Sequence, residues 1–200
     1  MPLQPKGSTK PPARGAATRA KIRDAANALF IRQGFEATTV DEIVAQAGVA
    51  KGTFYAHFDS KEELLLEYVS TRITRAEAQL PLLVAEPNFE AALARVVAIS
   101  LRGKLWWNRD VARLAIETIT ARSADYEEVV RGLVKPLVEI GQARGQVRTD
   151  IAPEILARFI VRVLLGVVLD WTESGIGGTR DQALDSALVL VMSASRPAPG

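Results

Sequence analysis

Apolar residues recur every three or four positions along most of this chain, which is the spacing of one buried face of an α-helix. The pattern therefore predicts an all-α protein of about nine helices. The expected helices span residues 17–33, 40–47, 51–58, 61–81, 89–105, 110–122, 126–143, 153–171 and 180–195.

The second and third of these helices are short and are separated by a tight turn. Thr39 is a good N-cap residue, and Glu42 follows three positions later, so the two side chains are expected to form a capping box. Gly48 ends the first of the two helices, at a position where a residue with positive φ is wanted. The next helix is expected to begin at Lys51.

This next helix has an apolar face and a face with unusually small residues. Phe54 and Phe58 are four residues apart and are expected to point inward. On the other side, Gly52 lies beside Lys51 and Tyr55. Small residues beside a cation and a phenol suit a helix that approaches the floor of a DNA groove. The two helices together therefore predict a helix-turn-helix.

Residues 38–61 resemble the DNA-binding motif of the TetR (tetracycline repressor) family of bacterial transcription regulators. Ala50 departs from the pattern, because the family usually has a Ser there that caps the recognition helix. The loss of such a cap costs about 0.5–2 kcal/mol. The matching positions are Thr39, Val40, Ile43, Val44, Ala47, Gly48, Val49, Gly52, Thr53, Phe54, Tyr55, His57, Phe58 and Lys61.

The resemblance also implies how the motif contacts DNA. Lys51, Gly52 and Thr53 would begin the recognition helix and reach base edges. A second set of side chains would bind phosphates, and it includes the single His of the chain. This set comprises Thr38, Thr39, Tyr55, His57 and Lys61.

Charge is distributed unevenly along the chain. Residues 1–61 carry a net charge of +4, and the remaining residues carry −2. We expect residues 1–16, which are rich in Pro, Gly and basic residues, to form a disordered arm. This arm either follows the DNA backbone or only adds solubility. Residues 17–62 would then form the DNA-binding domain, and residues 63–200 a helical regulatory and dimerisation domain.

The last two expected helices carry more apolar surface than a monomer of this size needs. We interpret them as half of a four-helix dimer interface, and the resemblance implies the same. Two identical DNA-binding heads would recognise a DNA site with dyad symmetry. The alternative is that both helices form the core of a monomer. The expected interface residues are Phe159, Val163, Gly166, Val167, Leu184, Ala187, Leu188 and Val191.

The resemblance implies a repressor that leaves its operator when a small molecule binds the C-terminal body. Aromatic residues in that region are candidates for a pocket, and the absence of a charge cluster predicts a mainly apolar ligand. They are Phe89, Trp106, Trp107, Tyr126 and Phe159. One alternative is a DNA-binding dimer without a ligand, controlled by a protein partner or by its own abundance. Another is an architectural protein that binds DNA of any sequence.

Composition argues against other classes of protein. The chain has no Cys and one His, which leaves no thiol chemistry and no expected metal site or cofactor. It also lacks a Gly-rich phosphate loop and a carboxylate pair with a partner base, so an enzyme is not expected. The N-terminus does not resemble a signal peptide, and the longest apolar run, residues 163–169, is too short to span a membrane. We therefore expect a cytoplasmic protein.

Overall fold

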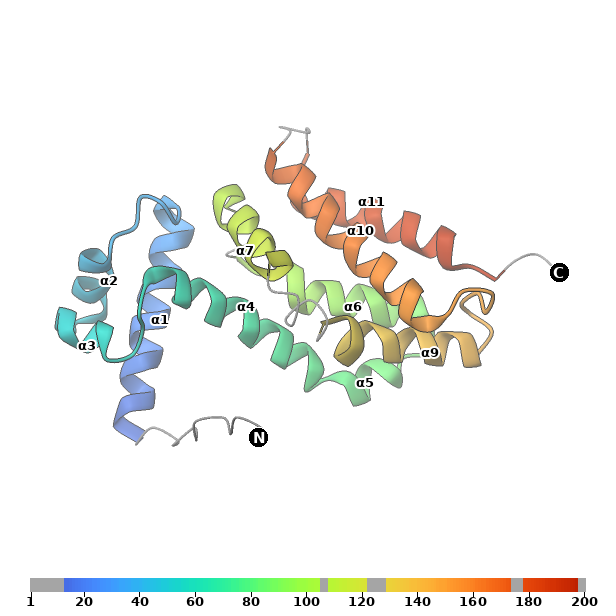
Figure 1. Ribbon diagram of the computed structural model, residues 1–200, viewed down its shortest axis with the longest axis horizontal. Coiled ribbons are helices and arrows are strands. Elements are labelled where there is room, and N and C mark those ends of the chain that lie inside the picture. The colour runs from blue at the N-terminus through green and yellow to red at the C-terminus, as the bar shows by residue number, and fades with distance from the viewer. Residues whose placement is uncertain (1–12, 105–107, 122–128, 174–177, 198–200) are drawn as a thin grey trace, which may run out of the picture. The chain divides into compact units, whose positions relative to one another are not determined.

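The computed structural model describes residues 13–104, 108–121, 129–173 and 178–197 (Figure 1). Every regular element within these ranges is a helix, which confirms the all-α fold class. The chain divides into two compact units, one ending at Leu64 and the other beginning at Leu65.

The N-terminal unit contains α1 (Ala13–Gln33), α2 (Val40–Ala47), α3 (Lys51–Tyr55) and the first residues of α4 (Lys61–Glu77). α1 packs against α2, and α2 packs against α3. Their apolar faces form a core in which the largest fully buried side chains include Ile22, Leu29, Phe30, Ile43, Phe54, Phe58 and Leu64.

α1 begins four residues earlier than its expected start at residue 17. Residues 13–16 are therefore helical, which corrects the expectation that they belong to a disordered arm. The physical reason is the run from Ala13 to Ala20, which contains four Ala residues, and Ala has the highest intrinsic helix propensity. The rest of the expected arm, residues 1–12, lies outside the described residues.

Within the described residues, the C-terminal unit holds most of α4 and seven further elements. They are α5 (Leu80–Val84), α6 (Phe89–Leu101), α7 (Arg109–Ala121), a π-helical segment (Val129–Val134), α9 (Lys135–Ala143), α10 (Pro153–Glu173) and α11 (Arg180–Ser195). α10 is the central element, because it contacts α7, α9, α11 and the π-helical segment. Figure 1 shows α10 and α11 side by side.

Two prolines explain where the expected helices are divided. Pro81 occupies the first turn of α5, and Pro136 occupies the first turn of α9. Proline is tolerated in a first turn because the N–H that it lacks would have no partner there. The expected helix over residues 61–81 therefore becomes α4 and α5, and the described part of the run over 126–143 becomes the π-helical segment and α9.

Candidate DNA-binding surface and ligand cavity

The start of α2 is fixed by the expected capping box. The Thr39 hydroxyl accepts a hydrogen bond from the backbone N–H of Glu42 at 3.3 Å, and the Glu42 carboxylate accepts one from the backbone N–H of Thr39 at 2.8 Å. The side-chain amide of Gln33, on α1, donates to the same carboxylate. These contacts lower the pKa of Glu42, with the Thr39 N–H as the largest cause. The box therefore fixes the start of α2, and the Gln33 bond joins it to the end of α1.

The turn between α2 and α3 depends on Gly48. This residue has a φ of 66° and lies in the left-handed region, which favours glycine. Ala50 is the N-cap residue of α3 and makes no side-chain capping bond. α3 ends at Tyr55, three residues before the expected end, and the chain then turns so that Phe58 enters the core.

α3 presents its polar face to solvent. Tyr55 is 51% exposed, and Lys51 is exposed at the first position of the helix. A Cβ on Gly52 would meet no atom of the described residues within 4 Å outside its own helix backbone and chain neighbours. The packing of the protein therefore does not require glycine at this position, although glycine weakens a helix.

Lys51 has a partner that the sequence pattern did not indicate. Its ammonium lies 2.7 Å from the Asp41 carboxylate at the start of α2, and both side chains are more than half exposed. The hydrogen bond to Asp41 raises the pKa of Lys51. Because the pair is exposed, it orients Lys51 rather than adding much stability.

Two of the expected phosphate contacts have internal partners instead. Thr38 is 1% exposed and its hydroxyl donates to the carbonyl of Gly34 at 2.6 Å. The Lys61 ammonium donates to the carbonyls of Phe35, Thr38 and Glu36 at 2.9, 3.1 and 3.4 Å. Because three acceptors match the three donors of the ammonium, Lys61 holds the loop between α1 and α2. The other expected contacts, Thr39, Thr53, Tyr55 and His57, retain exposed surface.

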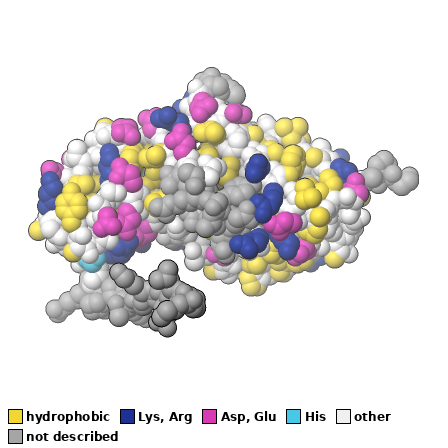
Figure 2. Space-filling view, in the orientation of Figure 1, with side chains coloured by type: hydrophobic (Ala, Val, Ile, Leu, Met, Phe, Trp, Pro, Cys, Tyr) yellow, Lys and Arg dark blue, Asp and Glu magenta, His cyan; other side chains and the backbone are white. Residues whose placement is uncertain are grey.

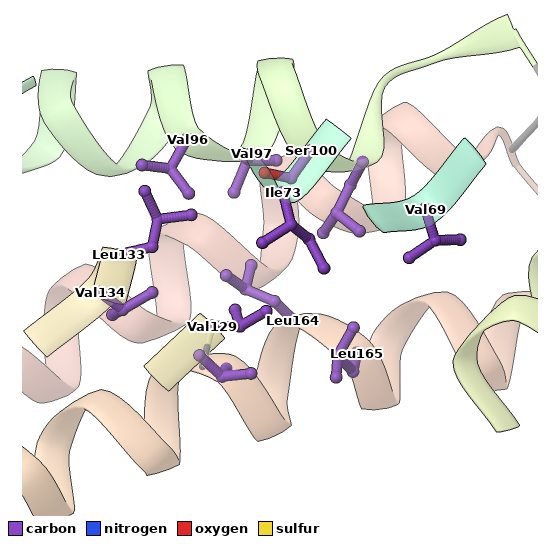
Figure 3. Close-up of a pocket in the computed structure, with 12 residues that line it drawn as sticks. Val69, Ile73, Val96, Val97, Ser100, Val129, Leu133, Val134, Leu164 and Leu165 are labelled. Atoms are coloured by element: carbon purple, nitrogen blue, oxygen red, sulfur yellow. The ribbon is translucent and has the colours of Figure 1, made fainter. Parts of the chain in front are cut away.

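The C-terminal unit contains an apolar cavity bounded by α4, α6, the π-helical segment and α10 (Figure 3). The volume of the cavity is about 60 Å³. It is therefore narrow. Its lining residues are Val69, Ile73, Val96, Val97, Ser100, Leu101, Val129, Leu133, Val134, Val161, Leu164 and Leu165.

Neither Phe89 nor Phe159, the two proposed pocket aromatics that the structure describes, lines this cavity. Phe89 is buried at the start of α6 and borders a separate crevice next to α9. Phe159 is 44% exposed on α10. Trp106, Trp107 and Tyr126 lie outside the described residues. The sequence signal for the cavity was the succession of aliphatic residues in α6 and α10, which aromatic content does not reveal.

The expected dimer surface is only partly exposed. Leu184, Ala187 and Val191 are fully buried within the protein, because they face α10, whereas Phe159, Val163, Gly166, Val167 and Leu188 retain exposed surface. Figure 2 shows hydrophobic side chains exposed on the part of the surface formed by α10 and α11. The large ones are Ile155, Phe159, Val189 and Leu190, which are between 44% and 66% exposed.

The described ranges contain neither a membrane-spanning helix nor a metal-binding cluster. No helix there is both long and apolar enough to cross a membrane. No cluster of three or more His, Asp or Glu side chains in those ranges has the arrangement of a metal site.

Comparison with known proteins agrees with this geometry. The family model for bacterial regulatory proteins of the tetR family matches residues 22–68. The HTH-type transcriptional repressor DhaR of Mycobacterium sp. (strain GP1) is 30% identical over 180 residues, which cover 84% of this chain and 87% of that protein. The HTH-type transcriptional repressor KstR2 of Rhodococcus jostii is 28% identical over 189 residues, which cover 87% of this chain and 89% of the relative.

Solved structures show the same fold. SmeT, the repressor of the Stenotrophomonas maltophilia multidrug efflux pump SmeDEF, has a TM-score of 0.65 at 24% identity, and the match covers 90% of this chain and 91% of that one. FadR of Thermus thermophilus, solved in complex with lauroyl-CoA, has a TM-score of 0.62 at 24% identity, with coverages of 91% and 99%.

Proposed function

We propose that this chain, which belongs to the TetR family of bacterial regulatory proteins, represses transcription as a homodimer that a small apolar molecule releases from its operator. Members of this family regulate transcription through the helix-turn-helix that residues 38–61 form here. Such a protein would act on DNA in the bacterial cytoplasm. The observation that carries the proposal is the exposed polar face of α3 around Gly52, a glycine that no contact within the protein requires.

We assign the base contacts to the start of α3, where Lys51, Gly52 and Thr53 lie. The missing side chain of Gly52 would let the backbone approach a base edge, and a lysine at this position can donate to guanine O6 and N7. Thr39, Tyr55 and His57 would bind phosphates. We assign Thr38 and Lys61 to support of the DNA-binding unit, because their polar groups already bond to the loop between α1 and α2.

The proposed dimer forms through α10 and α11. Exposed apolar side chains on both helices would bury one another across a two-fold axis, because an isologous interface pairs the same surface of each subunit. Ile155, Val189 and Leu190 join the exposed members of the expected interface, while Leu184, Ala187 and Val191 support it from beneath. Two copies of α3 would then bind half-sites of an operator with dyad symmetry.

The proposed effector acts through α4. This helix begins at Lys61, which holds the loop between α1 and α2, and its residues Val69 and Ile73 line the cavity. A molecule that enters the cavity therefore contacts the helix that leads directly from the DNA-binding unit. It would release DNA only if it bound the DNA-incompetent conformation more tightly than the competent one.

The alternative is a dimer without a ligand, controlled by a protein partner or by abundance. The apolar cavity favours the reading with a ligand. Protein cores are closely packed, so a C-terminal unit that binds no ligand is expected to fill such a space with side chains. The architectural alternative is binding to DNA of any sequence. It does not explain why glycine occupies the exposed position 52, where close approach to a base edge is not needed.

The test of the proposed function is selection of bound sequences from random duplex DNA by the purified full chain. We expect an inverted repeat, and we expect Lys51→Ala to lose preference for it while Lys135→Ala, a change on α9, keeps that preference. Binding without a recovered motif would replace the proposal by the architectural alternative. No binding to any duplex would overturn it.

A further inference from the structure

The cavity in the C-terminal unit is lined almost entirely by aliphatic side chains. Twelve described residues line it, of which eleven are Val, Leu or Ile and the twelfth is Ser100 near the end of α6. None of these twelve carries an aromatic ring or a charge. In Figure 3 the Ser100 oxygen is the single polar atom among the side chains drawn.

The Ser100 hydroxyl is buried and has no hydrogen-bond partner among the described residues. A serine near the end of a helix can often bond to a carbonyl of the preceding turn, but this hydroxyl does not do so here. A buried hydroxyl without a partner is unfavourable. A molecule in the cavity that bonds to Ser100 would remove this cost, and a purely apolar one would not.

We propose that the cavity binds an uncharged, mainly aliphatic molecule that carries one hydrogen-bonding group, and that the Ser100 hydroxyl binds this group. The inference rests on the proposed function only in so far as the cavity is taken as the effector site. The hydroxyl can donate or accept, so an alcohol, a ketone or an ester satisfies it equally.

The same lining disfavours the other chemical classes. A carboxylate or an ammonium would be taken out of water with no opposite charge among the described lining residues, which is costly. A molecule with several polar groups would leave all but one of them unpaired. The narrow interior favours an unbranched chain, the slimmest aliphatic skeleton, over a wide ring system.

The test is titration calorimetry of the full chain with four probes that share one carbon skeleton: 1-octanol, 2-octanone, octanoate and octylammonium. We expect the two neutral probes to bind and the two charged ones to bind at least tenfold more weakly. We expect Ser100→Ala to reduce affinity for both neutral probes about tenfold, the loss of one hydrogen bond to the ligand. Ser100→Thr, which keeps the hydroxyl, should keep most of that affinity.

Two controls separate this effect from a general change in the protein. Ser70→Ala removes an exposed hydroxyl from α4 outside the lining and should leave all affinities unchanged. Ser100→Leu fills the cavity and should abolish binding of the neutral probes. Without any probe, Ser100→Ala should melt at a higher temperature than the wild type, because it removes a buried hydroxyl that has no partner.

Tighter binding of either charged probe, no binding of any neutral probe, or equal affinity of wild type and Ser100→Ala would each overturn the inference. A parallel measurement of operator binding by fluorescence anisotropy tests the proposed function separately. If 1-octanol binds in a Ser100-dependent way but leaves operator affinity unchanged, the ligand assignment stands and the proposed release from DNA fails.

Discussion

At the scale of single residues, Gly52 distinguishes a requirement of the fold from a requirement of function. It lies inside α3 with a helical backbone and open space around the position of a Cβ. Glycine lowers helix stability at such a site relative to alanine. The protein therefore accepts a cost there that its own packing does not explain, and close approach of DNA supplies the reason.

Gly52→Ala should stabilise the free protein and weaken its binding to operator DNA. We expect a gain of about 0.5–1 kcal/mol in the free energy of unfolding, measured by urea denaturation. We expect operator affinity, measured by anisotropy, to fall about tenfold or more because the added methyl group separates the backbone from the base edge. If the variant is more stable and binds operator DNA as tightly as the wild type, the assignment of Gly52 to the recognition surface is wrong.

The Glu42 carboxyl makes the stability of the protein depend on pH in acid. Its pKa is lowered chiefly by the Thr39 backbone N–H, from a usual value of 4.5. A carboxyl of lowered pKa contributes stability above its unfolded value, and that stability is lost as the pH falls through the folded value. Glu42→Gln should therefore be less stable than the wild type at pH 7, and the difference should shrink below about pH 4.5.

Urea denaturation midpoints of wild type and Glu42→Gln across this pH range measure the effect. Glu36→Gln, which changes an exposed carboxyl in the loop between α1 and α2, is the matched control. If the difference between wild type and Glu42→Gln stayed constant with pH, the capping box would not be the source of the lowered pKa.

At the scale of elements, Arg72 joins α4 to the end of α6. Its guanidinium donates to the carbonyls of Ser100 at 3.1 Å and Ala98 at 3.4 Å, and also to the carbonyl of Ile99. Unpaired carbonyls at the end of a helix attract cations. Because Ser100 also lines the cavity, a change at the end of α6 reaches α4 through this contact.

Arg72→Met should weaken the coupling between the cavity and DNA binding. We expect the affinity of the variant for 1-octanol to differ less than threefold from that of the wild type. In the wild type 1-octanol lowers operator affinity by some factor, and we expect this factor to be severalfold smaller in the variant. The two affinities come from calorimetry and anisotropy on the same preparations. Arg75→Met, a substitution one turn further along α4, is the matched control. An unchanged factor in Arg72→Met would show that coupling takes another route.

The sequence pattern predicted the elements better than their ends. α11 spans the expected residues, and the Thr39–Glu42 capping box is present as predicted. The expected helix over 51–58 stops at Tyr55, and a turn follows in which the Phe58 N–H still donates to the Phe54 carbonyl at 2.9 Å. Local signals such as caps and prolines act within one turn of helix, whereas Phe58 is buried with the Arg19 guanidinium of α1 over its ring, a contact between residues distant in sequence.

At the scale of the whole molecule, the exposed apolar side chains on α10 and α11 make dimerisation testable. Leu190 is 65% exposed and belongs to the proposed interface. Leu190→Glu should shift the protein from dimer to monomer in light scattering after gel filtration, because the dimer interface would bury two like charges, one carboxylate from each subunit. The monomer should bind the operator at least tenfold more weakly, since it contacts one half-site.

Leu82→Glu provides the control, because Leu82 is a similarly exposed leucine that lies on α5. It should remain dimeric and keep operator affinity. If Leu190→Glu also remained a dimer, the interface would have to lie on another surface of the protein.

By itself the sequence determined the helical fold, the helix-turn-helix with its capping box and glycine turn, and the family, because these follow from contacts between residues close in the chain. Only the tertiary structure decided which polar groups remain available. It gave Thr38 and Lys61 internal partners, buried Leu184, Ala187 and Val191, and brought Ser100 to an aliphatic cavity. Apart from the Thr38 bond to Gly34, which is only four residues away, these outcomes depend on which segments pack together, and residues distant in sequence make those contacts.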